Sequence, residues 1–244
     1  MLTAFTGQVA LVTGAGGGIG RALALALGDA GAATVLVGRE AARLEALASA
    51  LTRGGRAARA CPVDLATDAG IADLVASVAR EGERVDVLVH AAGDHSMGSV
   101  AEVPVESLDR LLRVNLLAPY ALTRALLPAL RRAQGQVVFV NSSAALHPGA
   151  GAAAYAASKA GLRAFADALR AEVNADGIRV LSVFPGRTAT PMQEAIHRQE
   201  GIPYRPETLL QPEDVAAAVV AALGAARTAE VTEIAIRPMR KPQA

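Results

Sequence analysis

The chain has 244 residues, of which 52% are hydrophobic and 19% charged, with a formal net charge of +1. This composition excludes a mostly disordered chain and fits one α/β domain with a large core. With 24 basic and 23 acidic residues and no basic run, the sequence does not favour a nucleic acid as partner.

The rest of the composition bears on compartment and metals. Cys61 is the only cysteine, so an intramolecular disulfide is excluded. The apolar start, 1–10, lacks the basic segment of a signal peptide and is predicted to lead into a strand. We therefore expect a cytoplasmic protein with no membrane association. The four histidines lack the spacing of a zinc motif, so no metal is expected.

Short apolar runs alternate with longer amphipathic stretches, which is typical of a parallel sheet with crossover helices. The sequence therefore predicts an α/β fold, a single-domain doubly wound sheet over 1–244 with helices on both faces. Seven strands are predicted: Gln8–Thr13, Ala33–Gly38, Ala57–Val63, Val85–His90, Gln136–Ser142, Arg179–Phe184 and Glu233–Ile236. Helices are predicted near 19–30, 40–53, 67–81, 106–132, 155–174 and 212–226. The irregular stretch 185–211 is predicted to be a substrate loop.

A glycine-rich loop follows the first predicted strand and opens the first helix: Thr13-Gly14-Ala15-Gly16-Gly17-Gly18-Ile19-Gly20. Glycines let backbone N–H groups approach a pyrophosphate, and the helix N-terminus adds partial positive charge. Such a run is also compatible with a simple flexible turn. Its place between the first strand and the first helix favours a dinucleotide site, with Gly14, Gly16, Gly18, Ile19 and Gly20 as its candidate residues.

The end of the second strand bears on the choice of cofactor. An acid there would bind the ribose of NAD(H), but the sequence reads Gly38-Arg39. Gly38 leaves room for a 2′-phosphate and the guanidinium of Arg39 can pair with it, which favours NADP(H) over NAD(H). The alternative is that Arg39 is a solvated residue of the first turn of the next helix.

Tyr155 and Lys159 are four residues apart, so they share one face of the predicted helix. A nearby ammonium stabilises a phenolate and lowers the pKa of the phenol, so Tyr155 is expected to serve as acid and base. Ser142, at the end of a strand and thirteen residues earlier, is placed to hydrogen-bond a substrate oxygen. Its rival for that role is Ser143.

With these residues in view, the chain resembles the short-chain dehydrogenase/reductase family of Rossmann-fold, NAD(P)-dependent oxidoreductases from about Phe5 to Ile236. Thr13-Gly14-x-x-x-Gly18-x-Gly20 is similar to the family's cofactor loop. Asp64, in Val63-Asp64-Leu65, resembles the family's aspartate that forms a hydrogen bond with the adenine of the cofactor. Ala91-Ala92-Gly93 looks like the family's Asn-Asn-Ala-Gly segment, and Asn115 matches its helix asparagine.

The resemblance implies roles for these residues. Asn115 would hold a water for proton relay, Ser142 would orient the carbonyl, and Tyr155 would transfer the proton. Lys159 would bind the ribose hydroxyls and tune Tyr155. Segment 185–191 is similar to the family's Pro-Gly segment. There Pro185 and Gly186 would lie against the cofactor, Thr190 would hold the nicotinamide carboxamide, and Thr188 would contribute its backbone.

Two departures from the family pattern are present. His90 stands where the family usually has Asn, and it either substitutes for that side chain or only packs. The ending 231–238 replaces the family's glycine-rich tail and looks like the ending of reductases of small hydroxy acids. In the substrate loops, Leu146, Met192 and Ile196 would form an apolar wall. Arg187, His147 or His197 could meet a carboxylate, or each could simply be exposed.

The resemblance therefore implies an NAD(P)-dependent oxidoreductase that interconverts a ketone or aldehyde and an alcohol, and Gly38-Arg39 favours NADP(H) as its cofactor. It also implies a homo-oligomer, a tetramer or a dimer, joined through the helices near 106–132 and 155–174. One alternative is a dinucleotide-binding regulator that has lost catalysis, and another is an NAD-preferring hydroxy-compound dehydrogenase. A sugar-nucleotide epimerase or dehydratase is disfavoured by the chain's length and by its glycine spacing.

Overall fold

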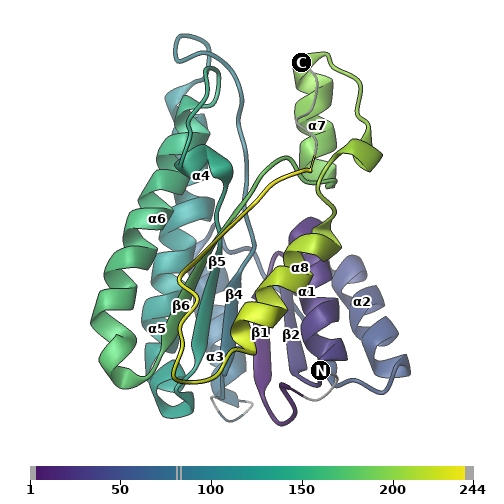
Figure 1. The fold of residues 1–244 in the computed structure, drawn as a ribbon, viewed down its shortest axis with the longest axis vertical. Helices are drawn as coiled ribbons and strands as arrows, with labels where there is room; N and C mark the ends of the chain where they lie inside the picture. Colours follow the sequence, from purple (N-terminus) through teal and green to yellow (C-terminus); the bar gives the residue numbers. More distant parts are fainter. Residues whose placement is uncertain (1–3, 81, 83, 240–244) are drawn as a thin grey trace.

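A computed structural model describes residues 4–80, 82 and 84–239. Its parallel strands form one sheet in the order β3-β2-β1-β4-β5-β6-β7 (Figure 1). The strands are β1 (Val9–Thr13), β2 (Ala33–Gly38), β3 (Ala58–Pro62), β4 (Val87–His90), β5 (Gln136–Val140), β6 (Arg179–Pro185) and β7 (Glu233–Ile236). The predicted Rossmann-type α/β fold with a seven-stranded parallel sheet is therefore confirmed.

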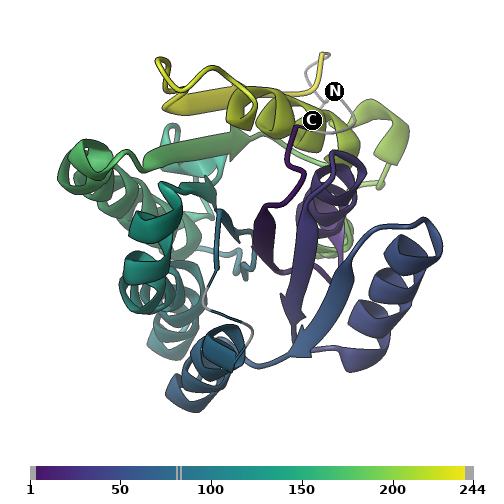
Figure 2. The same cartoon turned by 90° about the horizontal axis from the view of Figure 1, so that it is seen from below.

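The helices cover both faces of this sheet, as the view from below shows (Figure 2). One face carries α1 (Gly18–Asp29), α2 (Ala41–Arg53) and α8 (Pro212–Leu223), and the other carries α3 (Asp68–Arg80), α5 (Ala118–Ala133) and α6 (Ala153–Val173). Successive strand residues point to opposite faces. Val87 and Val89 thus enter the core under α1, while Leu88 enters the core under α5. Strands buried on both sides explain the continuous apolar runs of the sequence.

Two predicted segments differ from the structure. The helix predicted near 106–132 is a run of three pieces: α4 (Val105–Leu112), a π-helical turn η1 (Arg113–Leu117) and α5. The predicted loop 185–211 contains the helix α7 (Pro191–Glu200). Thr190 Oγ1 accepts a hydrogen bond from the backbone N–H of Gln193, and Pro191 occupies the first turn, so the segment has both an N-cap and a preset φ. Position 81 of the predicted third helix lies outside the described residues.

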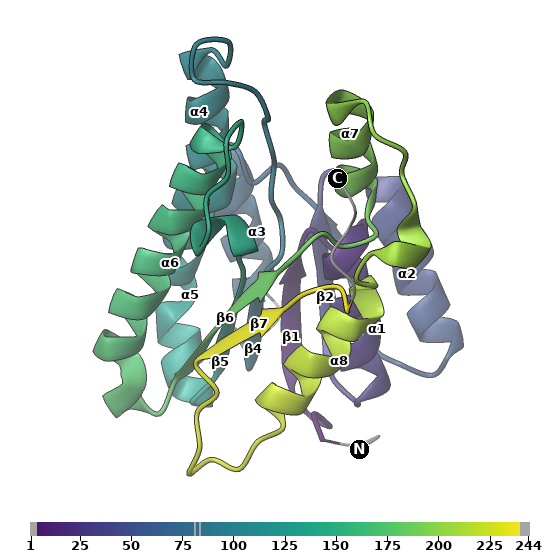
Figure 3. The same cartoon turned by 45° about the horizontal axis from the view of Figure 1, so that its top comes forward.

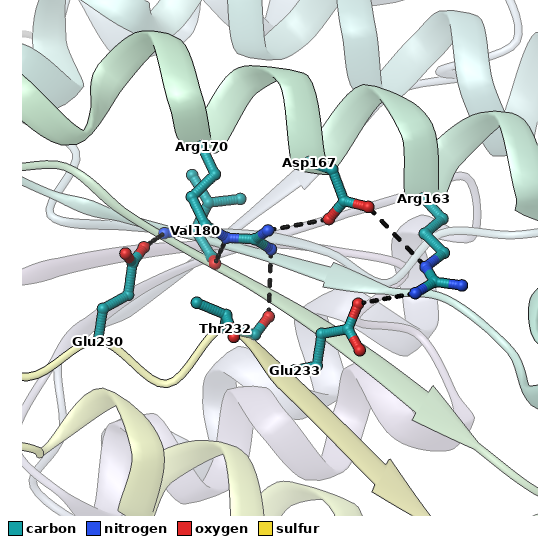
Figure 4. A network of polar contacts seen from close by, with 7 residues as sticks. All are labelled: Arg163, Asp167, Arg170, Val180, Glu230, Thr232 and Glu233. Carbon is teal, nitrogen blue, oxygen red and sulfur yellow. Dashed lines mark hydrogen bonds and ion pairs between the residues drawn. The ribbon is translucent and has the colours of Figure 1, made fainter.

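The edge strand β7 has only four residues and is held by side chains as well as by its ladder (Figure 4). Arg170 on α6 donates from Nε to the carbonyl of Val180 at 3.0 Å and from Nη2 to the carbonyl of Thr232 at 3.2 Å. Glu230 Oε1 accepts the N–H of Val180 at 2.8 Å. These contacts fix the 230–236 segment against β6.

The strand order reverses between β1 and β4, because the chain continues from β1 toward β2 and β3 but from β4 toward β5, β6 and β7. In open parallel sheets, ligands bind beyond the carboxyl ends of the strands at such a switch point. The helix α7 lies beyond these carboxyl ends (Figure 3). Among the described residues, no helix combines the length and the apolar character needed to cross a membrane.

Candidate active site

The glycine loop is shaped by close backbone contacts at the end of β1. Gly14 has φ +68°, and a Cβ there would lie 2.7 Å from the carbonyl oxygen of Ala91 and from the nitrogen of Ala92. A Cβ at Gly20 would collide with the carbonyl of Gly14, and Gly18 has φ +52°. These three positions therefore require glycine. They let the backbone of the loop form a cradle at the start of α1 that a pyrophosphate can approach.

Thr13, to which the sequence assigns no separate role, joins the glycine loop to the end of β4. Its Oγ1 accepts hydrogen bonds from the N–H groups of Ala91 and Ala92, at 3.0 and 3.1 Å, and donates to the carbonyl of Val89 at 3.1 Å. The hydroxyl is buried and all of its bonding capacity is used. It thus fixes the 91–93 segment beside the loop across the switch point of the sheet.

Asn115 is fully buried in the π-helical turn and ties the loop after β4 to α6. Its Oδ1 accepts the N–H of Asp94 at 2.8 Å, and its Nδ2 donates to the carbonyl of Asp94 and to Ser158 Oγ, each at 3.0 Å. Ser158 Oγ in turn donates to the carbonyl of Tyr155 at 2.7 Å. A Cβ at Gly93 would lie 3.4 Å from Asn115 Oδ1. The turn therefore positions this asparagine and, through it, the start of α6.

Tyr155 and Ser142 form a hydrogen bond and line the same cleft. Ser142 caps the short η2 turn (Ser143–Ala145), because its Oγ accepts the N–H of Ala144 at 3.1 Å. Burial raises the pKa of the Tyr155 phenol above its usual value, while a hydrogen bond with Ser142 acts in the opposite direction. The phenol is therefore protonated at neutral pH.

Lys159 lies one helical turn after Tyr155 and is almost fully buried. Its Nζ donates to the carbonyl of Val140 at 3.0 Å, and burial lowers its pKa to about 8. The expectation of a Tyr155 pKa lowered by this ammonium is not met in this structure. The phenol and the amine both lose hydration on folding, and for the phenol that loss outweighs any gain from its neighbours.

A cleft of about 210 Å³ opens between β5, β6 and α7. It brings together seven of the predicted site residues: Ile19, Ser142, Tyr155, Pro185, Gly186, Thr188 and Thr190. At its outer rim, Gln199 Nε2 on α7 donates to the carbonyl of Met97 at 2.9 Å. The helix missing from the sequence prediction therefore forms one wall of the cleft and touches the loop after β4.

Asn141 is a cleft residue that the sequence reasoning missed. Only 4% of it is exposed, and its Oδ1 accepts the N–H of Ser142 at 2.9 Å, which fixes the orientation of the amide. Its Nδ2 is buried and has no hydrogen-bond partner among the described residues. Because a buried donor without a partner costs free energy, this group is suited to a ligand oxygen. Nothing in the sequence beyond its place before Ser142 signals this role.

The predicted 2′-phosphate position is open. Arg39 is exposed at the end of β2 and forms no ion pair in the described part of the chain, whereas its neighbour Glu40 is paired with Arg43 at 2.9 Å. A Cβ at Gly38 would lie 3.9 Å from the backbone nitrogen of Gly16. A glycine at 38 thus keeps the space beside the phosphate loop clear, with a free guanidinium next to it.

The predicted adenine contacts lie at the end of β3. Asp64 is exposed, and its Oδ1 accepts the N–H of Ala66 at 3.0 Å, which holds the turn that leads into α3. Leu65 is 8% exposed and belongs to the core under α3 and α5. The carboxylate therefore has its second oxygen available at the rim of the sheet, while Leu65 anchors the turn. Ala92 and Gly93 lie on the other side, beside Thr13 and Asn115.

His90 is a packed core residue in this structure. It is 3% exposed, its Nε2 lies 2.8 Å from Thr123 Oγ1, and its ring stacks on Phe139 with centroids 5.0 Å apart. Burial lowers its pKa to about 3, so the imidazole is neutral. In the described residues, no three or more His, Cys, Asp or Glu side chains come together as a metal site.

Known proteins are similar to this chain in sequence and in fold. An uncharacterized oxidoreductase of Staphylococcus epidermidis is 32% identical over 233 residues, which are 95% of this chain and 97% of that protein. A metagenomic short-chain oxidoreductase solved in complex with NADP is 33% identical, with a TM-score of 0.84, and the match covers 98% of this chain and 100% of that one. An alcohol dehydrogenase of Thermococcus sibiricus, complexed with 5-hydroxy-NADP, is 27% identical with a TM-score of 0.88 over 97% and 99% of the two chains.

The short chain dehydrogenase family model matches residues 8–201. That span contains the glycine loop, the π-helical turn with Asn115, the cleft residues Ser142 and Tyr155, and Lys159. Sequence, fold and site thus lead to the same conclusion: the chain belongs to the short chain dehydrogenase family of oxidoreductases.

Proposed function

We propose that this protein transfers a hydride between NADP(H) and a small carbonyl or alcohol substrate, with Tyr155 as the proton-transferring residue. The observation that carries the proposal is the contact of Tyr155 with Ser142 in the cleft, together with the hydrogen bonds that connect Asn115 to the start of the same helix. The cleft lies at the carboxyl ends of β5 and β6, next to the glycine loop.

The chain's own residues account for the proton. In reduction, the Tyr155 hydroxyl gives its proton to the substrate oxygen as that oxygen gains negative charge, and Ser142 donates a second hydrogen bond to the same atom. The raised pKa of Tyr155 suits this direction, because the phenol is protonated at neutral pH. In alcohol oxidation the proton moves the other way and Tyr155 must first be deprotonated.

The residues present fit a dinucleotide. The backbone cradle of Gly14, Gly18 and Gly20 suits the pyrophosphate, and the unpartnered Nδ2 of Asn141 is a donor for a ligand oxygen. By the family resemblance, Lys159 would bind the ribose hydroxyls and Thr190 the carboxamide. A bound nicotinamide supplies the hydride in carbonyl reduction and accepts it in alcohol oxidation, so that atoms and electrons balance with the Tyr155 proton.

NADP(H) is the cofactor that we propose. Support comes from the unpaired Arg39, from the absence of a side chain at Gly38, and from the NADP and 5-hydroxy-NADP bound in the two similar structures described above. Replacing Arg39 by Ala should raise the KM for NADPH about tenfold or more and leave the KM for NADH unchanged. A clearly lower KM for NADH than for NADPH in the unaltered protein would make NAD(H) the better assignment.

The central test is removal of single hydroxyl groups. Tyr155→Phe should abolish turnover while the quenching of NADPH fluorescence on binding is retained. Ser142→Ala should lower kcat by about 10²-fold or more, whereas Ser143→Ala, at the neighbouring cleft position, should change it little. Full activity in Tyr155→Phe would end the assignment. If the unaltered protein binds NADPH but reduces no carbonyl in a broad panel, the regulator alternative is the better one.

We further propose that residues 1–244 act as one cytoplasmic catalytic unit that assembles into a homo-oligomer. Support for assembly comes from Leu117 and Tyr120, which lie at the junction of the π-helical turn and α5 and are 47% and 50% exposed. Large apolar side chains exposed next to each other are typical of subunit interfaces. The segment 185–211 is proposed to select the substrate, because α7 forms a wall of the cleft.

A further inference from the structure

The lining of the cleft includes a pair of opposite charges. Arg187 follows β6, and Glu200 is the last residue of α7. Arg187 Nη2 lies 3.1 Å from Glu200 Oε1 and 3.0 Å from Oε2, and the two side chains are 38% and 25% exposed. Within the described residues, these are the only charged side chains that line the cleft. The remaining lining is apolar or uncharged, with Met97, Met192 and Ile196 beside the pair.

Only one nitrogen of the Arg187 guanidinium is in use. Both oxygens of Glu200 contact Nη2, and neither Nε nor Nη1 has a partner in the described part of the molecule. A guanidinium has five N–H donors and binds a carboxylate best through two parallel hydrogen bonds, from Nε and Nη2 or from Nη1 and Nη2. Because both of these faces include Nη2, a second carboxylate can bind through two parallel hydrogen bonds only after Glu200 has been displaced.

The positions of the two residues support different roles for them. Arg187 is anchored at its backbone, since its carbonyl accepts the N–H of Leu210 at 3.1 Å and Thr188 forms a bridge with Leu210. Glu200 sits at the negative end of the α7 dipole, which is an unfavourable place for a carboxylate that lacks a cation. Glu200 thus depends on Arg187 for its charge balance, whereas Arg187 would be satisfied by any carboxylate in the cleft.

We propose that the cleft takes a carbonyl or alcohol substrate that carries a carboxylate, that Arg187 binds this carboxylate, and that Glu200 competes with the substrate for the guanidinium. The inference rests on the proposed function and names the substrate class of the same site. Ser142 and Tyr155 would bind the reacting oxygen, and Arg187, which lines the same cleft, would bind the charged end. The apolar side chains that also line the cleft suit a short hydrocarbon segment.

The test compares short oxo acids with their methyl esters, assayed as carbonyl substrates with NADPH. Arg187→Met should lower kcat/KM for the acids about 100-fold, through two lost charged hydrogen bonds, and change that for the esters less than about threefold. Arg187→Lys should give an intermediate loss for the acids. Glu200→Gln should leave the acids unchanged or improve them, because a competing carboxylate is gone. Arg198→Met is the matched control, since Arg198 pairs with Glu194 on α7 and does not line the cleft.

The proposal is wrong if Arg187→Met and Glu200→Gln impair acids and esters alike, because the pair would then only hold α7 in place. It is also wrong if the unaltered protein prefers the esters. A second measurement does not require turnover: calorimetric titration with 3-hydroxybutyrate and with 3-hydroxybutyramide. Binding of the acid by the unaltered protein and its loss in Arg187→Met would support the site even if the hydride-transfer assignment failed. Equal binding of acid and amide would refute it.

Discussion

Replacing His90 by Gln should flatten the acid side of the pH–stability profile. Burial lowers the pKa of His90 to about 3, whereas an imidazole in the unfolded chain keeps a pKa of about 6.5. Below pH 6.5 the unfolded chain therefore binds a proton that the folded chain refuses. The contribution of neutral, buried His90 to the free energy of unfolding is therefore fully present above pH 6.5 and is lost progressively as the pH falls toward 3. Glutamine keeps a polar group near Thr123 Oγ1 but does not titrate.

The magnitude follows from the two pKa values. Each pH unit inside this window changes the free energy of unfolding by about 1.4 kcal/mol for one proton. On acidification from pH 7 to pH 5, about 1.5 pH units lie below the unfolded-state pKa of 6.5. Over this interval His90 should therefore lower the free energy of unfolding by about 2 kcal/mol. The lowered pKa of Lys159 also makes the stability rise with pH. It does so only above pH 8, so this effect does not overlap with that of His90.

Urea unfolding at fixed protein concentration, at pH 7 and at pH 5, measures the effect. The fall in unfolding free energy between the two pH values should be about 2 kcal/mol smaller in His90→Gln than in the unaltered protein. His147→Gln is the control, because His147 is exposed in the folded chain and its replacement should leave the profile unchanged. If His90→Gln and the unaltered protein lose equal stability on acidification, the imidazole is not buried in its neutral form and the packing account of His90 fails.

Three further outcomes are expected. Gly20→Ala should lower the free energy of unfolding by about 1–3 kcal/mol, because its Cβ meets the carbonyl of Gly14, whereas Gly17→Ala, with open space around it, should cost less than about 1 kcal/mol in the same urea titration. The rate of alcohol oxidation should rise with pH above neutrality while that of carbonyl reduction does not, because burial keeps Tyr155 protonated; an oxidation optimum below pH 7 would contradict this. Leu117→Asp should shift the mass in light scattering toward the monomer, and an unchanged mass would place the interface elsewhere.

The sheet could be predicted from the sequence because its strands are buried on both faces. The run 87–89 is apolar at successive positions, and only a central parallel strand between two helix layers buries all of its side chains. The helix α7 was missed because the Pro and Gly residues of 185–211 outweighed a weaker signal. That signal was present in Thr190-Pro191, an N-cap followed by proline, with Glu194 and Arg198 four residues apart.

The chemistry of single side chains was harder to predict, because it depends on distant residues. The sequence left the role of His90 open; its neutral, packed state comes from Thr123, 33 positions away, and from the ring of Phe139 on the next strand. The four-residue spacing of Tyr155 and Lys159 correctly predicted that both lie on one helix. The spacing did not reveal that the Lys159 amine donates a hydrogen bond to the carbonyl of Val140, or that burial is the main cause of the raised Tyr155 pKa. A four-residue spacing places two side chains on the same face of a helix, but it does not determine how far their polar groups are exposed to water.

The parts of the site differ in how firmly they are held, and this separates chemistry from substrate choice. Asn115 is held by three hydrogen bonds, and the Thr13 hydroxyl donates one and accepts two at the junction of β1 and β4. By contrast, α7 is joined to the loop after β4 by the hydrogen bond of Gln199 to Met97 and to the segment after β6 by the ion pair of Glu200 with Arg187, and both side chains of that pair are partly exposed. Exposed pairs of this kind contribute about 1 kcal/mol or less. Changes in α7 can therefore alter which substrate enters while the proton-transfer geometry below it stays fixed.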